Sequence, residues 1–386
     1  MHRALFALSL LVCLVASGCD YAHLAAGQLK ILWHRRPLAA AVQDPRLPPD
    51  DRALLARVDS VRAFARALGL RVGNQYTSFV EWPGDRIVTT LVRTRPGSLE
   101  TVGWWYPFLG RLPYRGYFDQ VRAEREARRL RERQGYDVCV SAVTAYSTLG
   151  WLDDPVTSPM LGRGAANLVE TLLHELVHAT VFVDGDADFN EGVALFVGQE
   201  AAIRYFESIE RERAAQTAAD DERVARADEA GAAGEARSRE GASPLPSAER
   251  VRAWVEDRRR IEATVLRFRE RVEAIAGRPD AAVQRAAAER VLRGELAALP
   301  LEVIDPGAIA AETRLSDACL ALRGTYFRDV PRHAALLAAE GGDLRVWIGR
   351  LIEWAKRDEP PARFFSDAFF AARPASGATP SAGLAH

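Results

Sequence analysis

Apolar residues recur at helical spacing along most of the chain, and this periodicity predicts a largely helical protein. The clearest case lies over residues 165–183, where Leu168, Leu172 and Leu176 fall on one face. Comparable patterns predict helices over residues 20–37, 50–68, 119–134, 190–210, 247–276, 280–298, 308–328 and 343–356.

The segment from 74 to 148 has a different pattern and predicts strands. Residues 87–92 are β-branched and lie between two turn-forming pairs, Gly84-Asp85 and Pro96-Gly97. Residues 102–109 are aromatic, and residues 136–143 alternate as in a strand with one buried face. We therefore predict an α+β fold, with a small mixed sheet beside the helix over 165–183 and a mainly helical C-terminal half.

The N-terminus has the pattern of a secretory signal peptide over residues 1–18, because a basic start precedes a short apolar run and small residues. The run is too short to span a bilayer comfortably. Small residues ending in Cys19 resemble the bacterial lipoprotein box, which predicts lipidation of Cys19 and attachment to a membrane. An ordinary signal peptide with a chance cysteine is the alternative. Asp20 favours the inner over the outer membrane, with the protein facing the periplasm.

Composition changes this picture little. The 48% hydrophobic content is that of a globular protein, and the net charge of −1 argues against a nucleic-acid partner. Of four cysteines, only Cys139 and Cys319 lie outside the N-terminal segment. An oxidising compartment permits a disulfide between them, and two buried free thiols are the alternative.

The strongest chemical signal is the segment 174–178, which reads H-E-L-V-H. On a helix, His174 and His178 lie one turn apart on the same face, as zinc ligands do, and Glu175 between them is placed to act as a general base. A catalytic zinc site takes three protein ligands, and Glu191 in the next helix is our choice for the third. The spacing predicts one Zn²⁺ per chain in a zincin-like fold.

Simpler interpretations remain open. The two histidines can be surface residues paired with Glu170 and Glu175. Asp188 and Glu191 have the spacing of a capping box, which would occupy Glu191 with backbone N–H groups. Three acidic residues of the same loop are rival ligands or partners of the histidines: Asp184, Asp186 and Asp188.

A zinc site that hydrolyses an amide bond also needs a hydrogen-bond donor for the oxyanion that forms on the carbonyl oxygen. Tyr326 is one candidate, and the others are Tyr114, Tyr117, Tyr146 and His333. Residues 147–150 are a candidate edge strand for an extended substrate. Three carboxylates are candidates to hold a free amine of the substrate: Glu170, Asp153 and Asp154.

Residues 190–194, N-E-G-V-A, resemble the segment that carries the third ligand in gluzincin aminopeptidases. A wider resemblance, over most of residues 19–335, is to a bacterial lipoprotein family of predicted zinc-dependent aminopeptidases. It rests on residues 27–29, 35–37, 114–118, 135–138, 145–151 and 153–155, together with the metal segment. The resemblance implies His174, His178 and Glu191 as ligands and Glu175 as base. The chain departs from the family in a long Ala/Arg/Glu-rich insert after residue 210, and it lacks the G-A-M-E-N segment of the better-known enzymes.

The predicted organisation follows from these features: signal peptide 1–18, lipidated tether and membrane-proximal helix 19–48, zincin-like catalytic domain 49–210, low-complexity insert 211–246, helical domain 247–372 and disordered tail 373–386. In the tether, Arg35 and Arg36 are placed near lipid phosphates, or else the helix docks on the catalytic domain. We expect a zinc metallopeptidase of the bacterial cell envelope, in first place an aminopeptidase acting on peptides or proteins. The alternatives are an envelope endopeptidase and a zinc-binding lipoprotein without peptidase activity.

Overall fold

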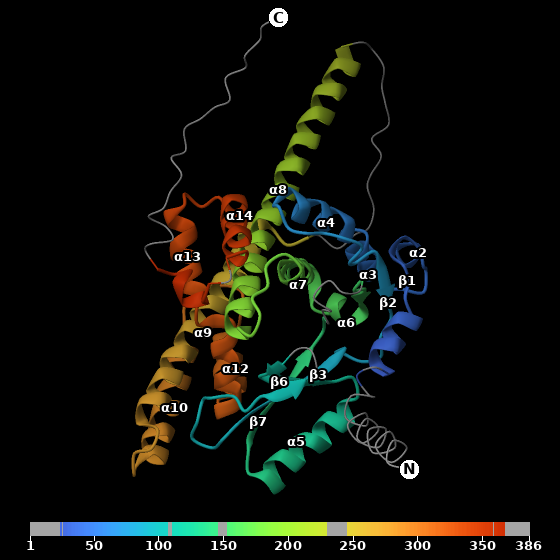
Figure 1. The fold of residues 1–386 in the computed structure, drawn as a ribbon. Helices are drawn as coiled ribbons and strands as arrows, with labels where there is room; N and C mark the ends of the chain where they lie inside the picture. The colour runs from blue at the N-terminus through green and yellow to red at the C-terminus, as the bar shows by residue number, and fades with distance from the viewer. Residues whose placement is uncertain are drawn as a thin grey trace, which may run out of the picture.

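The computed structural model of the chain describes residues 24, 26–106, 110–145, 153–229, 245–357 and 359–366 (Figure 1). Small sheets lie beside a mainly helical C-terminal half, which confirms the predicted α+β class. The predictions for the signal peptide, Cys19, Tyr146, residues 147–150 and the tail 373–386 fall outside the described residues. Among the described helices, none combines the length and the apolar character needed to cross a membrane.

A three-stranded antiparallel sheet lies at the centre of the first half, with the strand order β6-β3-β7. Its strands are β3 (Val88–Thr94), β6 (Tyr114–Tyr117) and β7 (Asp137–Val143). A second sheet has the order β1-β2-β8, and a hairpin joins two more strands: β1 (Arg36–Pro37), β2 (Ser78–Val80), β8 (Val156–Thr157), β4 (Trp104–Tyr106) and β5 (Gly110–Leu112).

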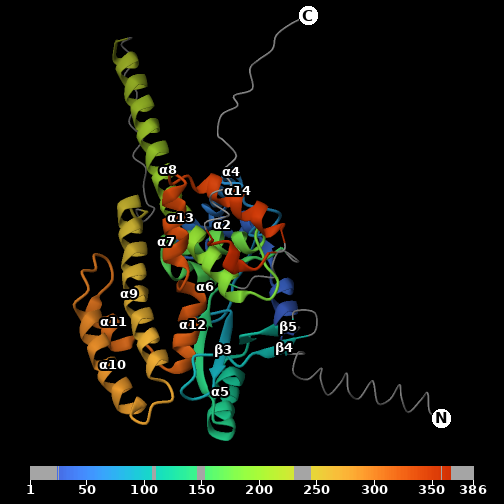
Figure 2. The same ribbon diagram turned by 60° about the vertical axis from the view of Figure 1, so that its left-hand side comes forward.

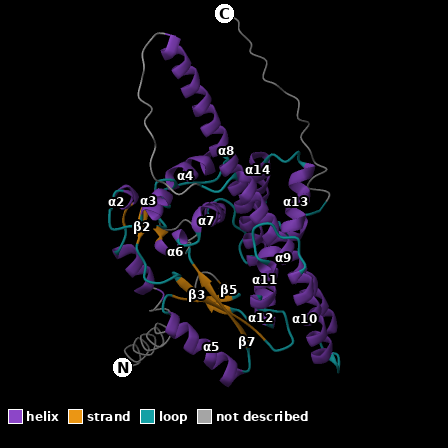
Figure 3. Cartoon of the chain, turned by 180° about the vertical axis from the view of Figure 1, so that it is seen from behind, coloured by secondary structure: helices purple, strands orange, loops and turns teal. Residues whose placement is uncertain are grey.

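Helices cover both faces of the central sheet because successive side chains of a strand point to opposite sides. Leu91 packs with residues of α5 (Gln120–Gln134) on one face. Its neighbour Val92 packs with Cys319 of α12 (Asp317–Phe327) on the other face. Figure 2 shows α5 and α12 flanking β3, and Figure 3 shows the same elements from behind, with the strands in orange.

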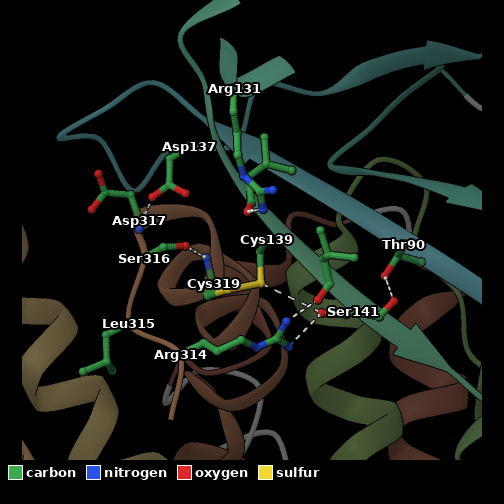
Figure 4. The surroundings of a disulfide bond; sticks show 12 residues. Thr90, Arg131, Asp137, Cys139, Ser141, Arg314, Leu315, Ser316, Asp317 and Cys319 are labelled. Atoms are coloured by element: carbon green, nitrogen blue, oxygen red, sulfur yellow. Dashed lines mark hydrogen bonds between the residues drawn. A yellow bond between two sulfur atoms is a disulfide. The ribbon is translucent and has the colours of Figure 1, made fainter. Parts of the chain in front are cut away.

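A disulfide joins the sheet to this second helix. Cys139 of β7 and Cys319 of α12 are bonded, although 180 positions separate them (Figure 4). Both are almost fully buried, at 2% and 6% exposure. The sequence left this pairing open, since it requires two segments to meet that no local pattern connects.

The largest core surrounds the predicted metal helix, α7 (Gly164–His178), and the helix after it, α8 (Ala187–Glu229). Further helices pack around these two: α2 (Leu38–Val42), α3 (Pro49–Leu55), α4 (Val58–Ala67), α6 (Ser158–Leu161), α13 (Val330–Ala339) and α14 (Leu344–Ala355). α9 (Ala248–Ile275) begins in this core. Its second half forms a separate core with α10 (Ala281–Ala297), α11 (Pro306–Glu312) and α12. The last helical element of the described residues is a 3₁₀ turn at Pro361–Arg363.

Several predicted element boundaries were wrong. α8 does not end near residue 210 but continues to Glu229 and projects from the body of the molecule (Figure 1). The helix predicted over 308–328 is interrupted, because Ser316 caps a new helix by accepting a hydrogen bond from the Cys319 N–H. The sequence interpretation missed α13, which begins with Pro331 in its first turn, a position where proline is tolerated.

The N-terminal helical segment packs on the sheets, as the docking alternative describes. Ile31 is buried against Trp82 and Val88. Arg35 donates a 2.6 Å hydrogen bond to the Asp153 carbonyl, and Arg36 pairs with Asp44. Contact of the two arginines with lipid stays a prediction, as do the domain boundaries.

Candidate metal and catalytic site

α7 presents the two histidines together at its C-terminal end. Leu172, Leu173 and Leu176 anchor the helix in the core, which directs the remaining face toward α8. The His174 and His178 rings lie 4.8 Å apart, centroid to centroid, and their Nε2 atoms are 3.1 Å apart. The helical geometry expected from the H-E-x-x-H spacing is therefore present.

Glu191 reaches the same point from the first turns of α8. Its Oε2 atom lies 3.3 Å from His174 Nε2 and 3.4 Å from His178 Nε2. The Asn190 side chain fixes this approach, because it accepts from the Val183 N–H at 2.8 Å and donates to the Val183 carbonyl at 2.7 Å. These two bonds close the connection between α7 and α8 and so set the direction of Glu191.

The capping alternative for Glu191 was wrong. Asp186 caps α8 instead, by accepting a 2.9 Å hydrogen bond from the Phe189 N–H. Asp188 pairs with Arg328 at 2.7 Å. Among the described residues, the group that can hold a metal ion consists of His174, His178 and Glu191, whose ligand atoms all lie within 4.8 Å of one another.

Burial makes the electrostatics of these groups strongly interdependent. Burial opposes the charge of Glu191, yet the two histidines hold the pKa of its carboxyl well below the usual range. Burial alone would lower the pKa of His178, but the Glu191 carboxylate beside it raises that pKa above its ordinary value. The site thus contains an ionised carboxylate against two imidazoles.

The donor set and its spacing fit zinc. Two atoms that each lie 2.0–2.1 Å from a tetrahedral zinc ion are about 3.3–3.4 Å apart. The three separations between His174 Nε2, His178 Nε2 and Glu191 Oε2 are 3.1, 3.3 and 3.4 Å. Two imidazole nitrogens with one carboxylate oxygen are also a common ligand set of catalytic zinc.

Tyr326 of α12 completes the wall of the site. Its ring lies 6.4 Å from the His174 ring and nearly parallel to it. Burial and the nearby charges of Glu191 and Glu175 raise the pKa of Tyr326 well above its ordinary value. The phenol therefore stays protonated and is available as a hydrogen-bond donor.

Comparison with known proteins identifies the family of the chain. Residues 20–363 match the model of a family described as "Putative aminopeptidase". The chain belongs to this family. Membership indicates a peptidase. No curated protein and no solved structure matches the chain.

In a peptidase of this family, most of the other oxyanion candidates are less well placed than Tyr326. His333 is fully buried in an aromatic cluster that includes Phe196 and Phe365, and burial lowers its pKa to about 3. Tyr117 lies in the core under α5. Tyr114 remains near the site, since its phenol contributes to the raised pKa of Tyr326.

Sequence reasoning missed Tyr76. This residue is 3% exposed and adopts a left-handed backbone with φ of 63°, a conformation that a non-glycine residue rarely takes. A 2.7 Å hydrogen bond from its N–H to the Asp154 carbonyl holds the backbone there. Burial together with the Glu175 and Asp154 carboxylates raises the pKa of Tyr76, which places the phenol near the predicted base. Such strained residues concentrate at functional sites, but no pattern in Asn74-Gln75-Tyr76 indicates the strain.

One candidate for the substrate amine is already occupied. Glu170 is 5% exposed and accepts two hydrogen bonds from Arg258 of α9, at 2.6 and 2.7 Å. This carboxylate fixes α9 against α7 and is not free to hold an amine. Asp154 is buried beside Tyr76, and the Asp153 carbonyl is bound by Arg35.

Proposed function

We propose that the chain is a zinc-dependent aminopeptidase that hydrolyses peptides or proteins. The observation that carries the proposal is the convergence of His174, His178 and Glu191 at separations that suit one zinc ion. Family membership supports the same class of reaction.

Zinc held by these three residues would polarise the scissile carbonyl and bring the pKa of a coordinated water toward neutrality. Glu191 supplies the single negative charge of the ligand set, so the site would keep a net charge near +1. His174 and His178 would hold the zinc through their Nε2 atoms, since α7 keeps both rings one helical turn apart.

Glu175 is the proposed general base. This residue follows His174 on α7, is half-buried, and its charge raises the pKa of both Tyr76 and Tyr326, so it lies near the site. It accepts the proton of the attacking water and delivers it to the leaving amine nitrogen. Tyr326 donates its phenolic proton in a hydrogen bond to the oxyanion that forms on the carbonyl carbon.

The proposed location is the bacterial cell envelope, with Cys19 lipidated and the enzyme facing the periplasm from the inner membrane. The Cys139–Cys319 disulfide supports export, because disulfides persist in oxidising compartments. Incorporation of a radiolabelled fatty acid that Cys19→Ala abolishes tests the lipid, and equal labelling of both forms would contradict it.

The decisive experiment combines metal analysis with a peptide-library assay on the chain lacking residues 1–19. We expect one zinc per chain and release of N-terminal residues from free but not acetylated peptides. Glu175→Gln should keep the zinc and lower kcat by at least about 100-fold, since general base catalysis contributes 10²–10⁴. Glu212→Gln, an exposed residue of α8, is the matched control and should leave kcat unchanged.

Other outcomes distinguish the alternatives. Internal cleavage of acetylated peptides would identify an endopeptidase. Full zinc content without any hydrolysis would identify a zinc-binding lipoprotein.

A further inference from the structure

A cavity of about 230 Å³ lies beside the candidate metal site. Its wall includes the Cys139–Cys319 disulfide, Arg314 and Arg323, together with Glu262 of α9 and Tyr326. Ligand pockets for drug-sized molecules measure roughly 300–1,000 Å³, so this cavity suits about one substrate residue.

Tyr326 links the cavity to the metal ligands. The same side chain lines the cavity and lies nearly parallel to the His174 ring, 6.4 Å away, centroid to centroid. A substrate residue in the cavity would therefore be next to the scissile bond.

The charges of the cavity do not cancel. Glu262 pairs with Arg323, which neutralises both. The Arg314 guanidinium meets only uncharged acceptors among the described residues, namely the Val140 carbonyl and the Ser141 hydroxyl at 3.5 Å (Figure 4). Partial burial and the charge of Arg323 lower the pKa of Arg314, as expected for a cation without a nearby anion.

The position of Arg314 is fixed by the protein itself. Its hydrogen bonds to β7 hold the guanidinium at the mouth of the cavity, where the residue remains exposed. Arginine presents five donors in a planar fork, and the two bonds to β7 leave others for a ligand. A carboxylate is the ligand that this fork binds best.

We propose that this cavity is a specificity subsite in which Arg314 binds a carboxylate of the substrate next to the scissile bond. The inference rests on the proposed peptidase function and adds a substrate class to it. The carboxylate belongs either to an acidic side chain or to the C-terminus of a short peptide. An ammonium group is disfavoured in this cavity because its net charge is positive.

Hydrolysis of matched peptides tests the subsite. Each pair differs by Glu against Gln at one position around the scissile bond, and each peptide is made with a free and with an amidated C-terminus. We expect kcat/KM to be about threefold to tenfold higher for the acidic member, as for a partly exposed charged hydrogen bond. A preference that follows the side chain identifies an acidic residue, and one that disappears on amidation identifies the C-terminal carboxylate.

Variants of Arg314 connect the preference to this residue. Arg314→Gln should abolish it by lowering kcat/KM for the acidic peptides to that of their neutral partners, and Arg314→Lys should restore part of it. The matched control is Arg267→Gln, because Arg267 is also exposed and donates to a backbone carbonyl, that of Ala263. Equal rates for acidic and neutral peptides, or a preference that survives Arg314→Gln, would overturn the proposal.

A binding measurement separates failure of the subsite from failure of the peptidase function. The measurement is titration calorimetry of the full chain with Gly-Glu and with Gly-Gln-amide. A chelator removes metal ions from the protein, so a carboxylate of the probe cannot bind to a metal. Tighter binding of Gly-Glu that Arg314→Gln removes supports the subsite even if no peptide is hydrolysed. Equal affinities for both probes contradict it even if the chain is an active aminopeptidase.

Discussion

Glu191 has two neighbours that stabilise its negative charge, and both are imidazoles whose Nε2 atoms lie within 3.4 Å of its Oε2. Replacing this carboxylate by an amide keeps its shape and removes the charge. We expect Glu191→Gln to weaken zinc binding by at least about 100-fold, because loss of an outer partner alone costs 10–100-fold. Competition with a chromophoric chelator measures the affinity.

Asp188→Asn is the matched control for this variant, since Asp188 was a rival ligand and pairs with Arg328 in the structure. It should bind zinc as the wild type does. If Glu191→Gln kept the wild-type affinity, Glu191 would not be a ligand.

A single substitution at Tyr326 can distinguish a role in catalysis from a role in metal binding. Tyr326→Phe keeps the ring beside His174 and removes only the hydroxyl. We expect kcat to fall by about 100-fold with little change in zinc affinity, as for the loss of one oxyanion donor. Tyr117→Phe, in the core under α5, should leave kcat unchanged. Equal kcat values for Tyr326→Phe and the wild type would remove Tyr326 from the reaction.

At the scale of elements, the site depends on how closely α8 approaches α7. Gly198 of α8 faces His174, and a Cβ atom there would lie 3.2 Å from His174 Cβ. Gly198→Ala should therefore displace the helices by a few tenths of an ångström and weaken zinc binding several-fold, although alanine favours the helix by about 1 kcal/mol. Gly294→Ala in α10, where a Cβ meets nothing within 4 Å, should stabilise the protein without changing zinc affinity.

The part of the metal site that lies within single helices could be predicted from the sequence. The spacing of His174 and His178 defines the geometry on α7, and Glu191 was identified from its place in the next helix. Two other features could not be predicted from the sequence: the strained backbone of Tyr76 and the ion pair of Glu170 with Arg258. Both depend on segments that are distant in the chain. The break before Ser316 was missed for another reason: its cap is local, but the apolar spacing over residues 308–328 continues across it.

His333 of α13 should make the free energy of unfolding depend on pH. Burial and, less strongly, the charge of Arg332 lower the pKa of His333 to about 3, below the unfolded value of 6.5. The unfolded chain therefore binds more protons between these values, so this contribution to stability is present above pH 6.5 and is lost as the pH falls toward 3. We expect the free energy of unfolding to fall by about 1.4 kcal/mol per pH unit from this residue.

Urea denaturation between pH 7 and pH 4, in chelator so that metal release does not interfere, measures this slope. His333→Leu should reduce the slope by that amount, whereas His34→Gln at an exposed position should not. An unchanged slope in His333→Leu would show that the imidazole is protonated in the folded protein.

At the scale of the whole molecule, the two halves of the chain meet at the site. α7 and α8 supply the ligands, α12 supplies Tyr326, and α9 is fixed to α7 through Arg258 and Glu170. Amphipathic patterns predicted that most of these helices exist, but they do not encode which helices meet. The pairing of Cys139 with Cys319 shows this limit, because the bond depends on α12 covering one face of the sheet.

That disulfide should stabilise the assembly as a whole. It closes a loop with a separation of 180 residues, and restricting so long a loop in the unfolded chain stabilises the folded state by about 2–5 kcal/mol. We expect Cys139→Ala with Cys319→Ala to lower the free energy of urea unfolding by this amount. Because α12 also carries Tyr326, kcat should fall by a larger factor than the affinity for zinc.

The oxidised wild type with and without a reductant is the internal control, and the reductant should have no effect on the double variant. Equal unfolding midpoints for the oxidised wild type and the double variant would mean that core packing alone holds α12 on the sheet.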